Sequence, residues 1–296
     1  MAVHDLDLAV PAGSTYALLG PNGSGKTTTI RMILRIQEPD EGEVRLFGRP
    51  VDTHALDRVG HLPEERGLYP RMTALEVLVF LAELKGIPRR EGRVRVLEWL
   101  ERVGLAERAG DRVQSLSKGM QQKLQFVAAV AHDPEVVILD EPFSGLDPIN
   151  QTALRDIVAD LRRQGRTILL STHIIEHAER LCDHVCILAH GRAVAMGPLS
   201  EVRRAHGERV VALDVVHWTP EVESAVREAP GTEVVRHDGT AFEIRLLHGA
   251  DPDALLRHLV GRAVPVRRFE VVEPSLHQVF LERVGALPPE MEPIDV

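Results

Sequence analysis

The sequence has 296 residues, 44% of them hydrophobic and 27% charged, and its 35 basic and 44 acidic residues give a formal net charge of −9. This composition excludes a disordered chain, and the acidic balance excludes a large phosphate-neutralising surface, so we expect two globular domains and no nucleic-acid partner. Two cysteines, Cys182 and Cys186, are too few for a disulfide framework and favour a reducing, cytoplasmic compartment.

Apolar runs typical of strands alternate with helical stretches up to about residue 200, which is the pattern of a mostly parallel sheet covered by helices. The candidate core strands are residues 16–19, 136–139, 167–171 and 185–189. Polar residues follow the strands, so we expect a site at their carboxyl edge. All apolar runs are far shorter than the roughly 18 residues that span a bilayer, so we expect any membrane work to pass through a partner.

Residues 70–132 differ, because 74–85, 93–103 and 118–131 have helical periodicity and few β-branched runs. They predict a helical subdomain inserted into the sheet domain. The Arg-rich stretch 89–95 and the charged stretch 201–204 are interpreted as solvated helix faces.

A turn-rich segment, 196–200, precedes a second change of pattern. Residues 209–215, 232–236 and 241–247 predict strands, the last two joined by a hairpin at 237–239. Residues 220–228 and 252–260 predict helices. The resulting β-α-β-β-α-β order predicts a small α+β domain, followed by an amphipathic helix at 274–284 and a polar tail.

GPNGSGKT, residues 20–27, fits the phosphate-binding pattern G-x-x-x-x-G-K-[ST] and lies between a strand and the helical run 28–36. Glycines let backbone N–H groups turn towards phosphate oxygens, and the following helix adds a favourable dipole. Lys26 is expected to reach the β and γ phosphates, and the Thr27 hydroxyl to bind Mg²⁺. A glycine-rich turn without a ligand is the disfavoured alternative. The predicted nucleotide-binding residues here are Gly20, Pro21, Asn22, Gly23, Ser24, Gly25, Lys26, Thr27 and Thr28.

VVILDEP, residues 136–142, reads as a buried strand that ends in two acids, a placement that exposes both carboxylates at the sheet edge. Asp140 is expected to hold Mg²⁺ through water. Glu141 is expected to polarise the attacking water, since in-line hydrolysis depends on orienting the nucleophile. The alternative is that these acids only terminate a strand, which the nearby phosphate loop disfavours.

Three further motifs are LSKGMQQK at 116–123, SGLD at 144–147 and STH at 171–173. With the phosphate loop and VVILDEP, in this order, the chain resembles the nucleotide-binding subunit of ABC transporters. The resemblance implies an α/β P-loop NTPase domain at 1–205 with the helical subdomain at about 70–132, an α+β domain at 206–285 and a tail at 286–296. It also implies an ATPase that binds ATP and Mg²⁺ and forms a homodimer or heterodimer.

The resemblance further implies an integral-membrane permease subunit, encoded separately, that the ATPase drives from the inner face of the cell membrane. VEPSLHQVFLERVG, residues 272–285, looks like the terminal helix of a subset of exporter ATPases, the sodium-efflux-like group, which also tend to show LPEERGLYP and LSKGMQQK. Export is therefore expected. For the C-terminal domain we expect regulation or dimer support, with a stabilising lid as the alternative.

The resemblance assigns roles to single residues. Ser117 and Gly119 open a helix whose N–H groups would grip the γ-phosphate held by the opposite subunit. His173 would contact the γ-phosphate at the site of Glu141 and steady the water that Glu141 positions. Asp147 would lie at the dimer interface. Each has a plainer interpretation: Ser117 as an N-cap, His173 as a structural histidine and Asp147 as a surface aspartate.

The sequence departs from the family at several positions. Lys118 and Met120 replace a glycine and a glutamine of the usual motif, and Glu64, in HLPEERGLYP at 61–70, replaces a glutamine that contacts Mg²⁺. A carboxylate is also a hard-oxygen donor for Mg²⁺, with a solvated loop as the alternative. The family stacks adenine on an aromatic residue well before the phosphate loop, and Tyr16 lies too close to it. Either the chain starts upstream or adenine is held with less help.

Two other functions remain open: a soluble ABC-type ATPase in translation or DNA repair, and a non-catalytic nucleotide sensor. Translation members usually carry two cassettes and repair members carry long coiled coils, which this sequence lacks. Glu141 and His173 argue against a sensor. Cys182 and Cys186 would lie about 13 Å apart on a strand. They could not share one zinc at about 2.3 Å per sulfur and are expected to be buried thiols.

Overall fold

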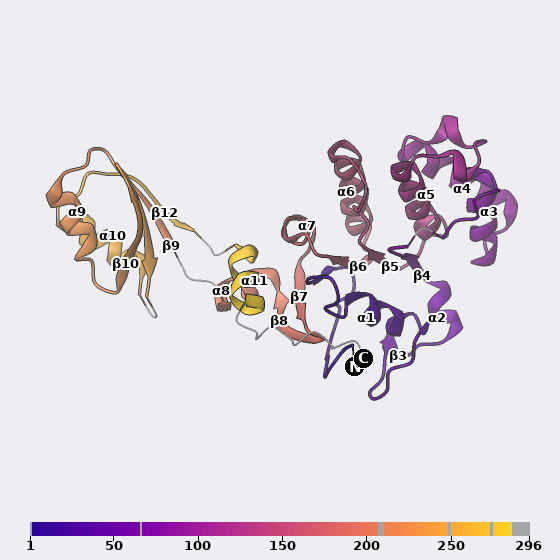
Figure 1. The fold of residues 1–296 in the computed structure, drawn as a ribbon, viewed down its shortest axis with the longest axis horizontal. Helices are drawn as coiled ribbons and strands as arrows, with labels where there is room; N and C mark the ends of the chain where they lie inside the picture. The colour runs from indigo at the N-terminus through magenta and orange to yellow at the C-terminus, as the bar shows by residue number, and fades with distance from the viewer. Residues whose placement is uncertain (1, 66, 207–209, 248–249, 273–274, 286–296) are drawn as a thin grey trace, which may run out of the picture. The chain divides into compact units, whose positions relative to one another are not determined.

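The computed structural model divides the chain into two compact units, Met1–Gly197 and Pro198–Val296 (Figure 1). It describes residues 2–65, 67–206, 210–247, 250–272 and 275–285. The division falls before the boundary expected after residue 205, because α8 (Leu199–His206) packs against α11 (Leu276–Gly285) of the second unit. Within the described ranges, every helix is too short or too polar to cross a membrane.

The first unit is built on a six-stranded sheet with the order β4-β5-β6-β1-β7-β8. In that order the strands are β4 (Val59–Leu62), β5 (Val136–Asp140), β6 (Thr167–Thr172), β1 (Thr15–Leu19), β7 (His184–Ala189) and β8 (Arg192–Pro198). The predicted core strands are all present, and the pairings among β4, β5, β6, β1 and β7 are parallel. Every residue of β1 is buried, because helices cover both faces of the sheet: α6 and α7 lie on one side and α1 on the other (Figure 1).

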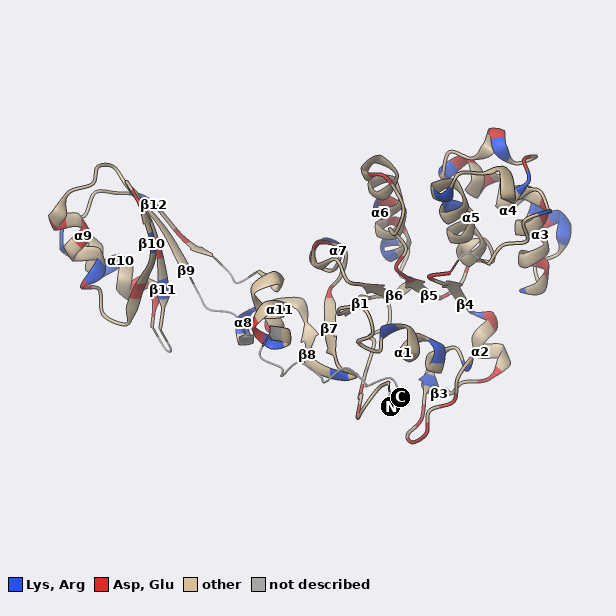
Figure 2. Cartoon of the chain, in the orientation of Figure 1, with Lys and Arg blue, Asp and Glu red and all other residues tan. Residues whose placement is uncertain are grey.

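Helices and a short hairpin complete this unit. They are α1 (Lys26–Ile33), β2 (Arg45–Leu46), β3 (Arg49–Pro50), α2 (Thr53–Asp57), α3 (Ala74–Leu84), α4 (Arg89–Arg102), α5 (Lys118–Val130), α6 (Pro148–Arg163) and α7 (Ile175–Leu181), with 3₁₀ turns at Ala106–Arg108 and Val113–Ser115. α3, α4 and α5 pack together as the predicted helical subdomain. Along these helices basic and acidic residues are interspersed (Figure 2), as expected for solvated faces.

The helical subdomain meets the sheet where α5 packs against β4. Gly60 permits this approach, because a Cβ atom there would lie 1.9 Å from the backbone oxygen of Ala129 on α5. The position of α5 over the sheet therefore depends on a residue without a side chain.

The second unit contains a four-stranded antiparallel sheet with the order β10-β11-β9-β12. Its elements are β9 (Val210–Val215), α9 (Pro220–Arg227), β10 (Thr232–Asp238), β11 (Ala241–Leu246), α10 (Pro252–Gly261) and β12 (Val266–Val272). The predicted β-α-β-β-α-β order is thus confirmed, and this strand order is ferredoxin-like. The segment 196–200, interpreted as turn-rich, is instead the end of β8 and the start of α8.

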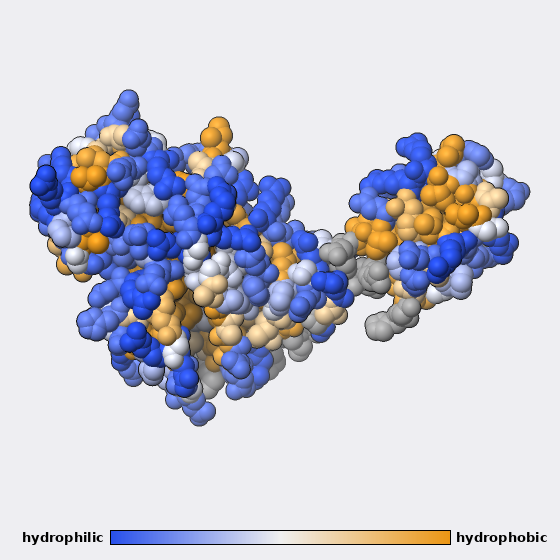
Figure 3. All heavy atoms as spheres, turned by 180° about the vertical axis from the view of Figure 1, so that it is seen from behind, coloured by the Kyte–Doolittle hydropathy of each residue, from blue (hydrophilic) through white to orange (hydrophobic). Residues whose placement is uncertain are grey.

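Alternation along the strands gives this sheet one buried face. Val211, Leu213 and Val215 are buried beneath α9 and α10, whereas Glu243 on the neighbouring strand is exposed. The second unit also carries surface apolar residues, which gather on the face seen in Figure 3. Between residues 210 and 272, its exposed large apolar side chains are Val216, Trp218, Val235, Leu247, Val260, Val271 and Val272.

Candidate functional site

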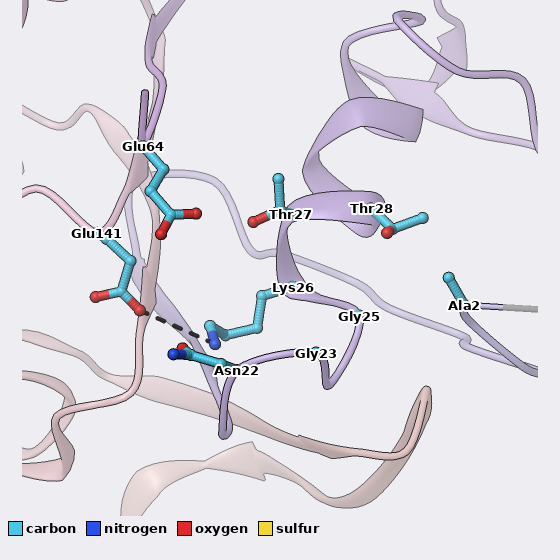
Figure 4. A pocket seen from close by; sticks show the side chains of 9 residues that line it. All are labelled: Ala2, Asn22, Gly23, Gly25, Lys26, Thr27, Thr28, Glu64 and Glu141. Carbon is cyan, nitrogen blue, oxygen red and sulfur yellow. Dashed lines mark ion pairs between the residues drawn. The ribbon is translucent and has the colours of Figure 1, made fainter. Parts of the chain in front are cut away.

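A pocket of about 510 Å³ lies at the phosphate loop, within the usual size range of small-molecule sites. It brings together segments that are far apart in sequence: the loop, the stretch after β4 and the end of β5 (Figure 4). The lining residues are Ala2, Asn22, Gly23, Gly25, Lys26, Thr27, Thr28, Glu64 and Glu141.

The loop has the shape of a phosphate cradle. Gly25, the N-cap of α1, has a φ of 104°, and a Cβ there would lie 2.8 Å from the backbone oxygen of Ala2. The helix begins at Lys26, earlier than predicted, so its first N–H groups belong to the loop. The Ser24 hydroxyl is buried without a partner among the described residues. A free hydroxyl beside open helical N–H groups fits phosphate oxygens, which accept such bonds.

Lys26 is buried at the floor of the pocket. Its Nζ donates to the backbone oxygens of Gly20, at 2.8 Å, and Pro21, at 3.0 Å, and lies 3.9 Å from Glu141 Oε1. Burial lowers the pKa of Lys26 below its ordinary value of 10.5, and the neighbouring carboxylates, Glu141 first, oppose this shift. An ammonium group held at the loop in this way is suited to bind an anion.

Glu141 is positioned by β6. Its N–H donates to the backbone oxygen and to Oγ of Ser171, both at 3.2 Å, and its Oε1 lies 2.9 Å from His173 Nδ1. Glu141 has a φ of 48°, a left-handed conformation that costs a non-glycine residue about 1–2 kcal/mol. Strain of this kind is typical of functional positions. Glu141 and His173, which the sequence analysis assigned to the same water, are thus in direct contact.

The expectation that both acids are exposed at the sheet edge is wrong. Asp140 and Glu141 are only 2% and 8% exposed, and both contact Ser171 on the neighbouring strand β6. Glu141 lines the pocket, whereas the carboxylate of Asp140 accepts a hydrogen bond from Ser171 Oγ. Ser171 belongs to the motif at 171–173, but its role in holding the two acids was not predicted; the signal for it is a polar residue near the end of an apolar strand.

The donor set suits a hard cation. Thr27, Glu64 and Glu141 offer oxygens to the same pocket, and Figure 4 shows the Glu64 carboxylate between the other two. Among the described residues no three His, Cys, Asp or Glu side chains form a metal cluster by themselves. A Mg²⁺ ion here would take its other ligands from phosphate and water, as this ion commonly does.

Ser117 and Asp147 lie outside the residues that line the pocket, and both are exposed N-caps. Ser117 Oγ accepts from the Met120 N–H at 3.3 Å at the start of α5, and Gly119 follows in its first turn. Asp147 Oδ1 accepts from two N–H groups of α6, each at 3.0 Å, and these bonds hold the pKa of Asp147 below its ordinary value. This cap was not predicted, although Asp followed by Pro at the first helical position is a signal for it.

Two other expectations concern buried residues. Tyr16 is buried and stacks on His184 at 5.7 Å, so its ring faces the core rather than the pocket. Cys182 and Cys186 are both buried free thiols, as predicted, and burial raises the pKa of Cys186 to about 12.

The chain is similar to known proteins over most of its length. The ABC transporter family model matches residues 3–144, and the model of the ATP-binding protein DrrA1-3-like C-terminal domain matches residues 197–284. The chain is 42% identical to an uncharacterized ABC transporter ATP-binding protein of Bacillus subtilis, over 97% of this chain and 94% of that one. It is 35% identical to the Nod factor export ATP-binding protein I of Burkholderia orbicola, over 96% and 92%. The solved dimeric structure of a bacterial ABC transporter cassette superposes with a TM-score of 0.62 at 27% identity, covering 67% of this chain and 90% of that one.

Proposed function

The chain belongs to the ABC transporter ATP-binding proteins and is an ATPase, and we propose that it dimerises around ATP and Mg²⁺ to drive a separately encoded membrane permease, for export. The observation that carries the proposal is the pocket in which Glu64 and Glu141 lie beside the phosphate loop and its Lys26. Similarity to a protein named for Nod factor export supports the direction of transport. The inner face of the cell membrane is the proposed location, reached through the permease.

In this proposal the loop from Gly20 to Thr28, which includes Lys26, binds the phosphates of ATP. Thr27 and Glu64 would hold Mg²⁺ directly and Asp140 through water, and the bound ion would neutralise phosphate charge. Glu141 orients the attacking water, and the 2.9 Å contact with His173 keeps its carboxylate in place. Orientation is the main contribution that such a reaction requires of the protein.

A second copy would complete the site. Ser117 is exposed at the start of α5, and the first N–H groups of that helix, including that of Gly119, are suited to the γ-phosphate of the partner's nucleotide. Asp147 is exposed as well and would contact the partner beside it. The dimeric cassette among the structural relatives supports this arrangement.

The permease contact is proposed on the helical subdomain beside the Glu64 segment. There Tyr69 and Leu84 are 52% and 65% exposed, and the rings of Tyr69 and Phe80 meet edge to face at 5.8 Å. Exposed aromatic and aliphatic groups of this kind are typical of protein interfaces. For the second unit we propose regulation or dimer support, for which its surface apolar residues are suited (Figure 3).

Glu141→Gln tests the proposal. The variant should bind ATP, hydrolyse it about a hundredfold to a thousandfold more slowly, and accumulate as a dimer on gel filtration with ATP and Mg²⁺. The matched control is Glu135→Gln, which makes the same change at an exposed residue just before β5 and should keep wild-type turnover. A Glu141→Gln protein that stays monomeric with ATP, or that turns over normally, contradicts the shared site. Mass spectrometry of the protein recovered with the chain from membranes would identify the permease.

A further inference from the structure

Helix α5 carries two buried glutamines whose side chains contact the backbone next to two pocket residues. Gln122 and Gln125 are 2% and 4% exposed and lie three positions apart, hence on one face of the helix. Gln122 Nε2 donates to the backbone oxygen of Pro142 at 3.2 Å, and Gln125 Nε2 donates to that of Glu65 at 3.0 Å. Each acceptor belongs to the residue that directly follows a glutamate of the pocket.

The two contacts differ in what else holds their targets. Glu141, before Pro142, is already fixed by Ser171 and His173. Glu64 lies in a segment without helix or strand, after β4 ends at Leu62. For the described residues 63–65 and 67–68, the hydrogen bond from Gln125 is the one that comes from another element. The position of Glu64 therefore depends on Gln125 far more than that of Glu141 depends on Gln122.

We propose that Gln125 is a positioning residue that holds Glu64 in the nucleotide pocket. It acts through the backbone of Glu65 and does not itself line the pocket. The hydrogen bond from Gln125 to Glu65, here called the tether, links helix α5 to the Glu64 segment. Helix α5, which Ser117 caps and which would contact the partner's nucleotide, therefore also positions Glu64 in the pocket of its own subunit. The part that concerns Mg²⁺ rests on the proposed function, whereas the tether itself does not.

Gln125→Met tests the tether, because methionine keeps the length and volume of the side chain but cannot donate. In the nucleotide-free full chain, cleavage by a glutamate-specific protease after Glu64 or Glu65 should speed up by about fivefold to tenfold, because one lost hydrogen bond makes local opening of the segment that much more frequent. The matched control is Gln121→Met on the same helix, whose amide donates to Val113 and Leu116 instead. This control should leave cleavage after Glu64 and Glu65 unchanged. Gln125→Asn, whose amide is too short to reach, is the second variant should the methionine protein not fold.

ATPase measurements at varied Mg²⁺ concentration test whether Gln125 acts through Glu64. In Gln125→Met the Mg²⁺ concentration for half-maximal ATPase activity should rise about fivefold, while the affinity for ATP in EDTA stays unchanged. In a Glu64→Ala background the Gln125 change should add nothing further.

The outcomes separate the two proposals. Unchanged cleavage after Glu64 and Glu65 in both Gln125 variants overturns the tether, and so does an equal effect of Gln125→Met on ATPase activity with and without Glu64. A wild-type chain whose ATPase activity is independent of Mg²⁺ contradicts the proposed role of Glu64, while the proteolysis experiment still decides whether Gln125 holds the segment.

Discussion

Acid should destabilise the first unit through a buried histidine. His132 follows α5, and its Nε2 lies 3.2 Å from the backbone oxygen of Val59, to which Lys85 Nζ also donates at 3.3 Å. Burial first, and then the charge of Lys85, lowers the pKa of His132 from 6.5 to about 4, against the opposing charges of Asp133 and Asp57. A proton on this ring would place two cations at one carbonyl.

The direction of this pH effect follows from the linkage between proton binding and folding. Because the folded-state pKa is the lower one, the unfolded chain binds the proton first, so stability is fully present above pH 6.5 and is lost as the pH falls towards 4. Between about pH 7.5 and pH 5, one such histidine removes about 2 kcal/mol from the free energy of unfolding. Burial likewise lowers the pKa of His177 to about 4 and that of His61 below its ordinary value, so these histidines add to the acid loss.

Urea unfolding at the two pH values measures this loss. A Trp218→Phe parent leaves Trp99, on α4, as the fluorescent reporter of the first unit. Between the two pH values, the free energy of unfolding of His132→Gln in this parent should fall by about 2 kcal/mol less than that of the parent itself. The control His54→Gln, at an exposed histidine of α2, should lose as much as the parent. A His132→Gln protein with the full acid loss of its parent would refute the reasoning.

Three further changes test the site and the fold. Lys26→Ala should weaken ATP binding about tenfold to a hundredfold in calorimetry, because a charged hydrogen-bond donor is lost; unchanged affinity would remove Lys26 from the site. Gly60→Ala should cost about 3 kcal/mol or more in urea, since the new Cβ meets the Ala129 oxygen at 1.9 Å, and wild-type stability would contradict that contact. Phe80→Ser should reduce recovery of the permease from membranes, whereas Leu97→Ser, at an exposed residue of α4, should not; equal recovery would exclude the proposed docking surface.

The parts predicted most closely are those whose structure is set locally. The phosphate loop is contiguous, and its glycines and following helix impose its shape. The strands and helices of the second unit follow their own periodicity, and their order was predicted correctly. Ends of elements differ where local chemistry was overlooked: α1 begins at Lys26 because Gly25 is its N-cap, and α4 begins at Arg89, after Pro88, rather than at residue 93.

The sequence by itself determined the fold class, the nucleotide loop and the candidate acids, because each is written in neighbouring residues. Only the tertiary structure decided which of them meet. Placing β4 beside β5 brings Glu64 to the pocket of Glu141, and placing β6 beside β5 brings Ser171 and His173 to the same acid. The burial of Asp140 and the tether from Gln125 to Glu65 also depend on that strand order. The spacing of residues along the chain does not determine these contacts. They depend on which strands are neighbours in the sheet and on which helices pack against them.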